Sequence, residues 1–275
     1  MTAQADAATP DYLSLLRLDG RGFVVLGAGQ GIGEQATLAL AQAGARVLCV
    51  DRDEALAARI AAKVGGVACA AEVTSRADME RIFRTARSAF GRVHGAVDII
   101  GVAGIRSLAA TDDALWDQQF DIVLRHAYLA IQVGGEMMAA DGGGAMTFVG
   151  SMSGNLAVAN QVAYGVSKAA LHHLVRSAAA EYGPRQVRIN GVAPGYVRTP
   201  RLNVRLDEKA WSAIANVIPL GRAASPAEIA GPLLFLSSDL SAHVTGAVLP
   251  VDGGAGVKAT LPDVTFGPAP VSVAG

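Results

Sequence analysis

Seven short apolar runs, rich in β-branched residues, recur along the chain and alternate with alanine-rich stretches. The runs are nearly continuous instead of alternating with polar residues, a pattern typical of strands buried on both faces of a parallel sheet. We expect strands at Phe23–Leu26, Arg46–Val50, Val67–Ala71, Ala96–Ile100, Ala145–Gly150, Val187–Val192 and Ala247–Pro250. Strand–helix alternation of this kind predicts an α/β fold, a doubly wound parallel sheet with helices on both faces.

The stretches between these runs have helical patterns. They are Gly33–Ala43, Asp53–Lys63, Arg76–Phe90, Asp112–Met138, Val162–Tyr182 and Pro226–Leu236. A chain of 275 residues can form one domain if its sheet is this large. We therefore expect a single domain over 18–254, preceded by an N-terminal extension, 1–17, and followed by a C-terminal tail, 255–275. Both extensions are expected to lie over the surface or to reach a neighbouring subunit.

Composition excludes several classes of function. Apolar residues make up 51% of the chain and charged residues 17%, and the formal net charge of −1 gives no electrostatic footprint for nucleic acid or an anionic membrane. No run reaches the roughly 18 apolar residues that span a bilayer, and the start of the chain lacks a signal-peptide pattern, so a cytoplasmic protein is expected. Cys49 and Cys69 lie in apolar runs and are expected to be buried free thiols. The five histidines, His172 among them, show no metal-ligand spacing, so they are expected to be packing or surface residues and no metal site is predicted.

A glycine-rich segment follows the first strand and opens the next helix. It reads Gly27-Ala-Gly-Gln30-Gly31-Ile32-Gly33, a GxxxGxG spacing in which Ile32 takes the third-glycine position of GxGxxG. Glycines allow a tight turn and a close approach of the backbone to a pyrophosphate, and the helix N-terminus offers free N–H groups to that anion. The segment therefore predicts a dinucleotide site. A purely structural glycine turn is the alternative.

An acidic residue, Asp51, ends the second strand 18 residues beyond Gly33. At this distance a carboxylate accepts hydrogen bonds from the adenosine ribose of NAD and repels the additional phosphate of NADP. Arg52 follows and offers a cation to that phosphate, but the glycine segment itself holds no basic residue. The balance favours NAD over NADP.

Tyr164 and Lys168 lie four residues apart at the start of a predicted helix, so their side chains share one face. A phenol with a pKa near 10 is a poor acid–base catalyst at neutral pH, and lowering that pKa by about three units takes roughly 4 kcal/mol of phenolate stabilisation. A lysine cation one turn away supplies part of it. Ser151, 13 residues earlier at the end of the fifth strand, can donate to a substrate oxygen. We predict that these three residues are catalytic.

Together these motifs resemble the classical short-chain dehydrogenase/reductase family over about Leu18–Gly254. The resemblance also includes the segments Pro194–Thr199, Pro219–Arg222 and Val251–Gly254. It implies a single-domain Rossmann-type fold and a homotetramer or homodimer. It further implies that Lys168 binds the nicotinamide ribose, and that residues of the segment after the sixth strand hold the nicotinamide end of the cofactor: Pro194, Gly195, Val197 and Thr199. Glu72-Val73, where the family usually has Asp-Val, is expected near the adenine.

Two departures from the family pattern stand out. The usual Asn-Asn-Ala-Gly is replaced by Asp98-Ile-Ile-Gly101, counting back 15 residues from Trp116, and these two end residues are assigned to the cofactor site. A second register, Gly101–Gly104, requires three additional residues. The catalytic Asn of the family, seven residues past Trp116, is replaced by Val123. Since that Asn helps to hold a water that joins the lysine to solvent, this proton path is in question.

The sequence thus predicts an NAD-dependent oxidoreductase that interconverts a hydrophobic secondary alcohol and its ketone. The alternative is a cofactor-binding module with little turnover, suggested by Val123. The expected pocket walls, 102–108, 152–159 and 196–206, are mostly apolar, with Asn155, Asn160 and Gln161 nearby. Three arginines, Arg198, Arg201 and Arg205, lie where the family usually builds a substrate lid; they either steer an acidic substrate or are solvated. Trp211 belongs to either a lid or the core.

Overall fold

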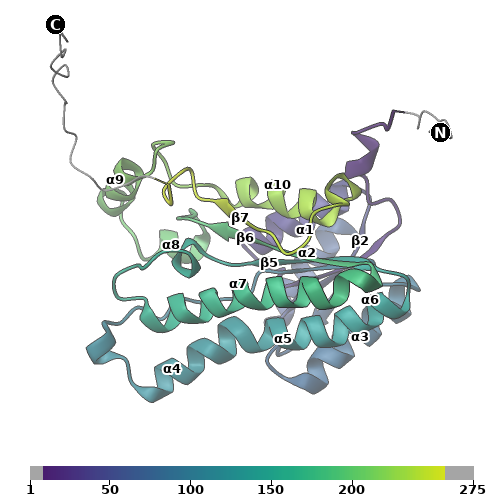
Figure 1. Ribbon diagram of the computed structural model, residues 1–275, viewed down its shortest axis with the longest axis horizontal. Helices are drawn as coiled ribbons and strands as arrows, with labels where there is room; N and C mark the ends of the chain where they lie inside the picture. Colours follow the sequence, from purple (N-terminus) through teal and green to yellow (C-terminus); the bar gives the residue numbers. More distant parts are fainter. Residues whose placement is uncertain (1–8, 258–275) are drawn as a thin grey trace, which may run out of the picture.

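The seven predicted strands form one parallel sheet in the computed structural model, which describes residues 9–257 (Figure 1). The strands are β1 (Gly22–Leu26), β2 (Arg46–Asp51), β3 (Val67–Ala70), β4 (Gly95–Asp98), β5 (Gly144–Val149), β6 (Val187–Pro194) and β7 (Val248–Val251). Their order is β3-β2-β1-β4-β5-β6-β7. The chain moves outward from β1 in one direction, returns, and continues from β4 in the other direction. This is the doubly wound topology, whose crevice lies at the carboxyl ends of β1 and β4.

The fourth strand ends two residues earlier than predicted. Ile99 N–H still donates to the Leu26 carbonyl at 3.0 Å, but Ile100 N–H turns to the Asp98 side chain, 3.0 Å from its Oδ1 atom. Gly101 follows with φ of +154°, which favours glycine. The Asp98 side chain therefore accepts from the Ile100 N–H that would otherwise continue the sheet. The strand ends there, although Ile99 and Ile100 continue the apolar sequence pattern. The prediction of strand structure to Ile100 was wrong.

The helices cover both faces of the sheet (Figure 1). One layer contains α1 (Ile32–Gln42), α2 (Glu54–Val64) and α10 (Pro226–Ser237), whose apolar residues share a core with the β1 side chains Phe23 and Val25. The other contains α3 (Arg76–Phe90), α7 (Val162–Tyr182) and the helical segment 113–140, which pack against Val24 and Leu26. Alternate residues of the same strand thus enter opposite cores, which confirms the predicted fold class.

The segment predicted as one helix over Asp112–Met138 is helical but contains two π-helical turns. It consists of α4 (Asp113–Phe120), a π turn (Asp121–Arg125), α5 (His126–Ala130), a second π turn (Ile131–Gly135) and α6 (Glu136–Ala140). Each π turn inserts a residue and rotates the faces of the helix that follow it. The first π turn holds Val123. At the second, a Cβ on Gly134 would lie 2.3 Å from the Phe83 ring, so a glycine permits the close packing of α3.

Two helices lie in the segment after β6 for which no helix was predicted: α8 (Pro200–Asn203) and α9 (Glu208–Val217). Both begin at a capping side chain, Thr199 and Asp207, which accept from the amides of Leu202 and Ala210. Trp211 is buried, with the Arg198 guanidinium 4.7 Å from its ring centre. Of the two roles expected for Trp211, the structure gives it core packing.

The described chain extends beyond the sheet at both ends. A short 3₁₀ helix, Ser14–Leu16, precedes β1, and residues 1–8 and 258–275, with most of the predicted tail, lie outside the described residues. We retain 18–254 as the proposed extent of the domain. Cys49 and Cys69 are buried free thiols, as predicted, and burial raises the pKa of Cys49 to about 12. Between residues 9 and 257, none of the helices combines the length and the apolar character that crossing a membrane requires.

Candidate active site

A cavity of about 510 Å³ runs along the carboxyl ends of the strands. Most of the residues that sequence analysis assigned to the site line it: Gly27, Gln30, Gly31, Ile32, Asp51, Arg52, Glu72, Val73, Gly101, Ser151, Tyr164, Lys168, Pro194, Gly195, Val197 and Thr199. Gly33 and Asp98 do not line it. Gly33 is buried behind the glycine segment, and Asp98 is buried beside Lys168 on the helix α5 side of the sheet.

The glycine segment is packed too closely to accept side chains. A Cβ on Gly33 would lie 1.8 Å from the Gly27 carbonyl oxygen, and one on Gly29 would lie 2.6 Å from Asp51 Oδ2. Helix α1 starts at Ile32 without a capping side chain, so no side-chain oxygen occupies its first amides. Free amides at a helix N-terminus, with the positive end of the helix dipole, form a site for an anion such as a pyrophosphate.

The Asp51 carboxylate fixes the two loops that meet at this end of the cavity. Its Oδ2 atom accepts from Gly29 N–H at 3.0 Å, and its Oδ1 atom accepts from Asp53 N–H at 3.1 Å. Each carboxylate oxygen has a second lone pair, so Asp51 can also accept from a ligand hydroxyl. The neighbouring Arg52 is exposed and also lines the cavity.

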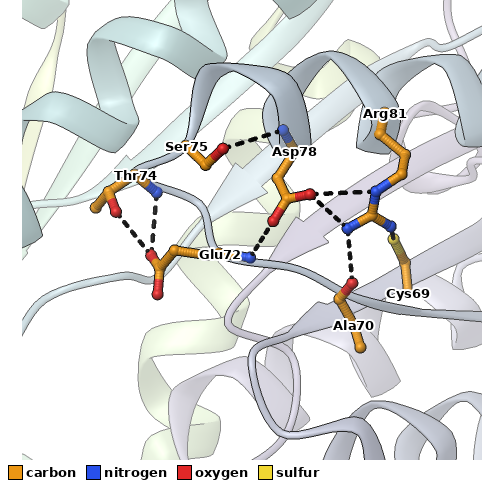
Figure 2. A network of polar contacts seen from close by, with 7 residues as sticks. All are labelled: Cys69, Ala70, Glu72, Thr74, Ser75, Asp78 and Arg81. Atoms are coloured by element: carbon orange, nitrogen blue, oxygen red, sulfur yellow. Dashed lines mark hydrogen bonds and ion pairs between the residues drawn. The ribbon is translucent and has the colours of Figure 1, made fainter.

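Glu72 belongs to a polar network that shapes the loop between β3 and α3 (Figure 2). Its carboxylate accepts from the backbone and hydroxyl of Thr74, at 3.1 and 2.9 Å, and its own N–H donates to Asp78. Arg81 links Asp78 to the Ala70 carbonyl and Cys69 Sγ. The Glu72 side chain is thus turned toward its own loop, and Val73 is buried beside it.

Ser151, Tyr164 and Lys168 meet in the middle of the cavity. Ser151 follows β5 with an extended backbone, while Tyr164 and Lys168 lie one turn apart on α7. Lys168 is buried, its Nζ atom donates to the Val149 carbonyl at 2.7 Å, and it lies 5.8 Å from the centre of the Tyr164 ring. Strand β5 therefore supplies the carbonyl that fixes the lysine, and the serine follows two residues after the strand ends.

Burial dominates the acid–base properties of these groups. It raises the pKa of Tyr164, and the hydroxyl of Ser151 acts in the opposite direction. Burial lowers the pKa of Lys168 to about 8, while the negative charge of Asp98 raises it. A cation and a phenolate in this site consequently depend on their neighbours for stabilisation.

His172, expected from the sequence to be a packing or surface residue, contacts the backbone of Ser151. Its Nε2 atom accepts from Ser151 N–H at 3.4 Å, and its Nδ1 atom lies 3.0 Å from Asn155 Oδ1. The ring occupies the space that a Cβ on Gly150 or Gly154 would need, at 2.2 and 2.6 Å. Burial lowers the pKa of His172 to about 4, so the ring is neutral. Gly150 and Gly154, on either side of Ser151, were the sequence signal that could have indicated a side chain packed against this turn.

The segment after β6 forms the outer wall of the cavity. Arg201 and Arg205 line it, whereas Arg198 pairs with Glu208 outside it. A second pocket shares Ala103, Ile105 and Arg205 with this cavity and continues it toward Arg106 and Asp112. Residues 152–159, predicted as a pocket wall, are not among the lining residues of either pocket; Asn155 is bound to His172 instead.

The two departures from the family pattern lie on different elements of the structure. A Cβ on Gly101 would lie 3.0 Å from Lys168 Nζ, whereas Gly104 faces Leu115 and Gln119. The register that ends at Gly101 therefore brings its glycine to Lys168. Val123 is fully buried in the first π turn, which packs against α7.

Comparisons with known proteins show which family the chain resembles. The family model described as enoyl-(acyl carrier protein) reductase matches residues 27–256. The chain is 39% identical to galactitol 2-dehydrogenase (L-tagatose-forming) of Cereibacter sphaeroides, over 89% of this chain and 98% of that protein. It is 36% identical to D-threitol dehydrogenase of Mycolicibacterium smegmatis, over 88% and 95% of the two chains. A 7α-hydroxysteroid dehydrogenase solved with NADH and 7-oxo glycochenodeoxycholic acid superimposes with a TM-score of 0.85 at 30% identity, over 88% of this chain and 96% of that chain.

These matches show that the chain belongs to the classical short-chain dehydrogenase/reductase family. Its class of activity is oxidoreduction at CH–OH groups, and its family binds nicotinamide cofactors.

Proposed function

We propose that the protein is an NAD-dependent dehydrogenase that interconverts a secondary alcohol and its ketone, with Ser151, Tyr164 and Lys168 as its catalytic residues. The observation that carries the proposal is the convergence of these three side chains on one wall of the cavity, beside the glycine segment. A serine that can hold an oxygen, a phenol that can move a proton and a buried ammonium are the groups that carbonyl reduction needs.

The residues present fit a dinucleotide. Glycines leave no room for a Cβ at Gly29 or Gly33, and the uncapped start of α1 offers its amides to a pyrophosphate. Pro194, Gly195, Val197 and Thr199 line the same cavity and would hold the nicotinamide end. The bound nicotinamide would supply or accept the hydride.

NAD is the preferred cofactor in this proposal. The Asp51 carboxylate, already oriented by two backbone amides, is suited to accept from a ribose hydroxyl and to repel a phosphate. The structural relative solved with NADH supports this choice. Arg52 is the cation that would favour NADP if Asp51 were removed.

The chain's own residues handle the proton and the oxygen. Ser151 would donate to the substrate oxygen and orient it toward the Tyr164 hydroxyl. During oxidation, Tyr164 takes the hydroxyl proton; during reduction, it returns a proton to the carbonyl oxygen. Because burial raises the pKa of Tyr164, the positive charge of Lys168 must stabilise the phenolate form.

The substrate is proposed to be a secondary alcohol with an apolar body. The part of the cavity beyond Tyr164 is lined by Val102, Ala103, Ile105, Ile122 and Leu202, with the guanidinium of Arg205 at its edge. A polyol is the second candidate, because the relatives act on galactitol and threitol, and Arg106, Asp112 and Arg205 could bind outer hydroxyls.

A module that binds cofactor with little turnover is the competing function, and Val123 is the observation that favours it. The two functions differ in one measurement. A binding module would bind NADH tightly and produce no turnover on a broad panel of alcohols and ketones.

The deciding experiment is an oxidation screen at mildly alkaline pH with NAD⁺ and, in parallel, NADP⁺. The panel contains galactitol, D-threitol, a 7α-hydroxysteroid and small cyclic and aromatic secondary alcohols. We expect NADH to form from NAD⁺ with at least one secondary alcohol. Little NADPH should form from NADP⁺. Turnover with none of these secondary alcohols, or with NADP⁺ alone, would contradict the proposal.

A homotetramer or homodimer is also proposed. Two large apolar side chains, Tyr128 on α5 and Val166 on α7, are each 43% exposed in the same helical layer. An interface between copies would cover them. Light scattering should give a mass of two or four chains, and a monomer at micromolar concentration would contradict this.

A further inference from the structure

A buried pair of ionisable side chains, Asp98 and His126, lies behind the catalytic lysine. Their exposed fractions are 3% and 1%, and His126 Nδ1 lies 2.8 Å from Asp98 Oδ2. The other carboxylate oxygen accepts from Ile100 N–H at 3.0 Å. Because an ionised carboxylate only accepts, His126 must carry its proton on Nδ1. Burying such a pair costs free energy of desolvation, so packing alone would be served better by apolar residues.

The pair lies close to Lys168, because Asp98 and the carbonyl that Lys168 binds belong to neighbouring strands. Asp98 ends β4 and pairs in register with Phe148 of β5, and the Val149 carbonyl, one residue further, is the group that Lys168 Nζ binds. Neighbouring strands lie about 4.8 Å apart, so the Asp98 carboxylate and the lysine ammonium share one buried region. Gly101, three residues after Asp98, also borders this region, since a Cβ at this position would lie 3.0 Å from Lys168 Nζ.

His126 reaches this region from the helical segment in which Val123 stands at the family's asparagine position. It begins α5 immediately after the π turn that contains Val123. Three residues apart, the two side chains are both buried, but only His126 brings polar atoms. Its Nε2 atom is buried and, among residues 9–257, makes no hydrogen bond. The helix thus presents its polar group to the interior from position 126 instead of 123.

We propose that Asp98 and His126 form a positioning pair that keeps Lys168 charged and in place beside Tyr164, in a protein whose helix has valine at the family's asparagine position. His126 positions the Asp98 carboxylate by a hydrogen bond, and the negative charge of the carboxylate in turn stabilises the buried ammonium. The catalytic part of this inference rests on the proposed function. The electrostatic part concerns Lys168 alone.

The other ionisable groups around Lys168 do not provide this stabilisation. On its own helix, Tyr164 is a neutral phenol and His172 is neutral, because burial raises the pKa of Tyr164 and lowers the pKa of His172 to about 4. From the π turn that packs against α7, Asp121 and Arg125 are exposed. From β4, Asp98 contributes the negative charge, which raises the pKa of Lys168 against the effect of burial.

The test measures the protonation of Lys168 directly. Lysine labelled with ¹³C at Cε is followed by NMR across pH 6–11 in the protein without cofactor, and the signal is assigned by its absence in Lys168→Met. Asp98→Asn keeps the size of the side chain and an acceptor for Ile100 N–H but removes the charge. We expect its Lys168 titration to move to lower pH by about one unit or more. Asp121→Asn, which removes an exposed charge from the π turn, should leave the titration unchanged.

A second pair of variants keeps the test valid if Asp98→Asn does not fold. His126→Leu removes the donor to Asp98, and His126→Asn places an amide N–H at the same position. We expect the titration to move to lower pH in His126→Leu and to return toward the unaltered value in His126→Asn. An unchanged Lys168 titration in a folded Asp98→Asn protein, or in folded His126→Leu if only that variant folds, overturns the proposal.

Activity provides an independent readout. With a substrate from the oxidation screen, the alkaline limb of the pH dependence of kcat should move in the same direction as the Lys168 titration. If no alcohol is oxidised but the titration shifts as expected, the proposed function fails while the positioning role stands. A shifted titration with an unmoved alkaline limb would overturn the catalytic part alone.

Discussion

The two ends of the cavity are built from opposite charges held in opposite ways. Where β1, β2 and β3 end, the acidic side chains of Asp51 and Glu72 are held by backbone amides or a neighbouring threonine. Where the loops after β4 and β6 face each other, Arg201 and Arg205 line the cavity and, within residues 9–257, form no ion pair. The first end is fixed before a ligand arrives, whereas the second leaves its cations free to adjust to one.

This contrast explains why the same family fold serves many substrates. The fixed end requires particular residues at particular distances, because backbone and carboxylate approach within hydrogen-bonding range. The adjustable end requires only that loops of suitable length lie above Ser151 and Tyr164. The predictions that follow test how strict the first end is, and how strongly the middle of the site depends on burial.

The largest effect is expected at the glycine segment. Gly33→Ala would place a Cβ 1.8 Å from the Gly27 carbonyl oxygen, so the backbone around the pyrophosphate site must move. We expect a loss of NADH affinity of at least tenfold and a destabilisation of about 1–3 kcal/mol, measured by fluorescence titration and thermal unfolding. Gly231→Ala in α10 is the matched control, because nothing lies within 4 Å of a Cβ there. Equal NADH affinity in both variants would show that this end is not strict.

Lys168→Met should remove activity and stabilise the protein. We expect turnover to fall at least 10²-fold. Because the folded pKa, about 8, lies below the ordinary value of 10.5, protonation of Lys168 costs stability as the pH falls from 10.5 to 8, and the cost is complete below 8. At pH 7 the variant should therefore gain about 2 kcal/mol, after the loss of the hydrogen bond to Val149.

The same comparison repeated above pH 10.5 serves as its control, since the lysine is then neutral in both the folded and the unfolded protein. The advantage of the methionine variant should disappear there. A variant that is less stable at pH 7, or a difference that does not change with pH, would contradict the assigned burial cost.

Sequence predicted the fold well, and most of the residues that it assigned to the fixed end line one cavity, because both follow local rules. Continuous apolar runs give parallel strands, and a glycine segment before a helix gives a close-packed turn with free backbone amides. The adjustable end was predicted less well: α8, α9 and the early end of β4 depend on side-chain caps and on Asp98, which takes a ladder hydrogen bond. The roles of His126 and His172 could not be predicted from sequence spacing. Their partners, Asp98 and Ser151, lie 28 and 21 residues away along the chain and are brought to them only by the folded structure.

A smaller effect is expected for cofactor choice at the fixed end. Asp51→Ala removes the charge that would repel the phosphate of NADP and leaves Arg52 free to pair with it. We expect the ratio of kcat/KM for NAD to that for NADP to fall about tenfold or more. Asp51→Asn, which keeps an acceptor for Gly29 N–H, separates the effect of charge from that of loop support. A preference of the unaltered protein for NADP would show that Arg52 dominates this end.

The smallest effect concerns the pH dependence of stability. Because burial lowers the pKa of His172 from 6.5 to about 4, its contribution to stability is complete above pH 6.5 and decreases as the pH falls toward 4. Between about pH 6.5 and pH 5 the unaltered protein should lose about 1–2 kcal/mol more than His172→Gln, measured by denaturant unfolding. Parallel curves for the two proteins would mean that His172 is protonated in the folded state without cost.

The middle of the cavity, where the two ends meet, is tested most directly by Tyr164→Phe. The measurement is hydride transfer in a single turnover, with NADH and the ketone of the preferred alcohol, alongside NADH affinity. Removing only the hydroxyl should leave NADH affinity within about twofold and slow hydride transfer by at least 10²-fold. The variant is not otherwise expected to differ in fold, since the aromatic ring is retained. Near-normal hydride transfer in this variant would contradict the assignment of Tyr164 as the acid–base catalyst.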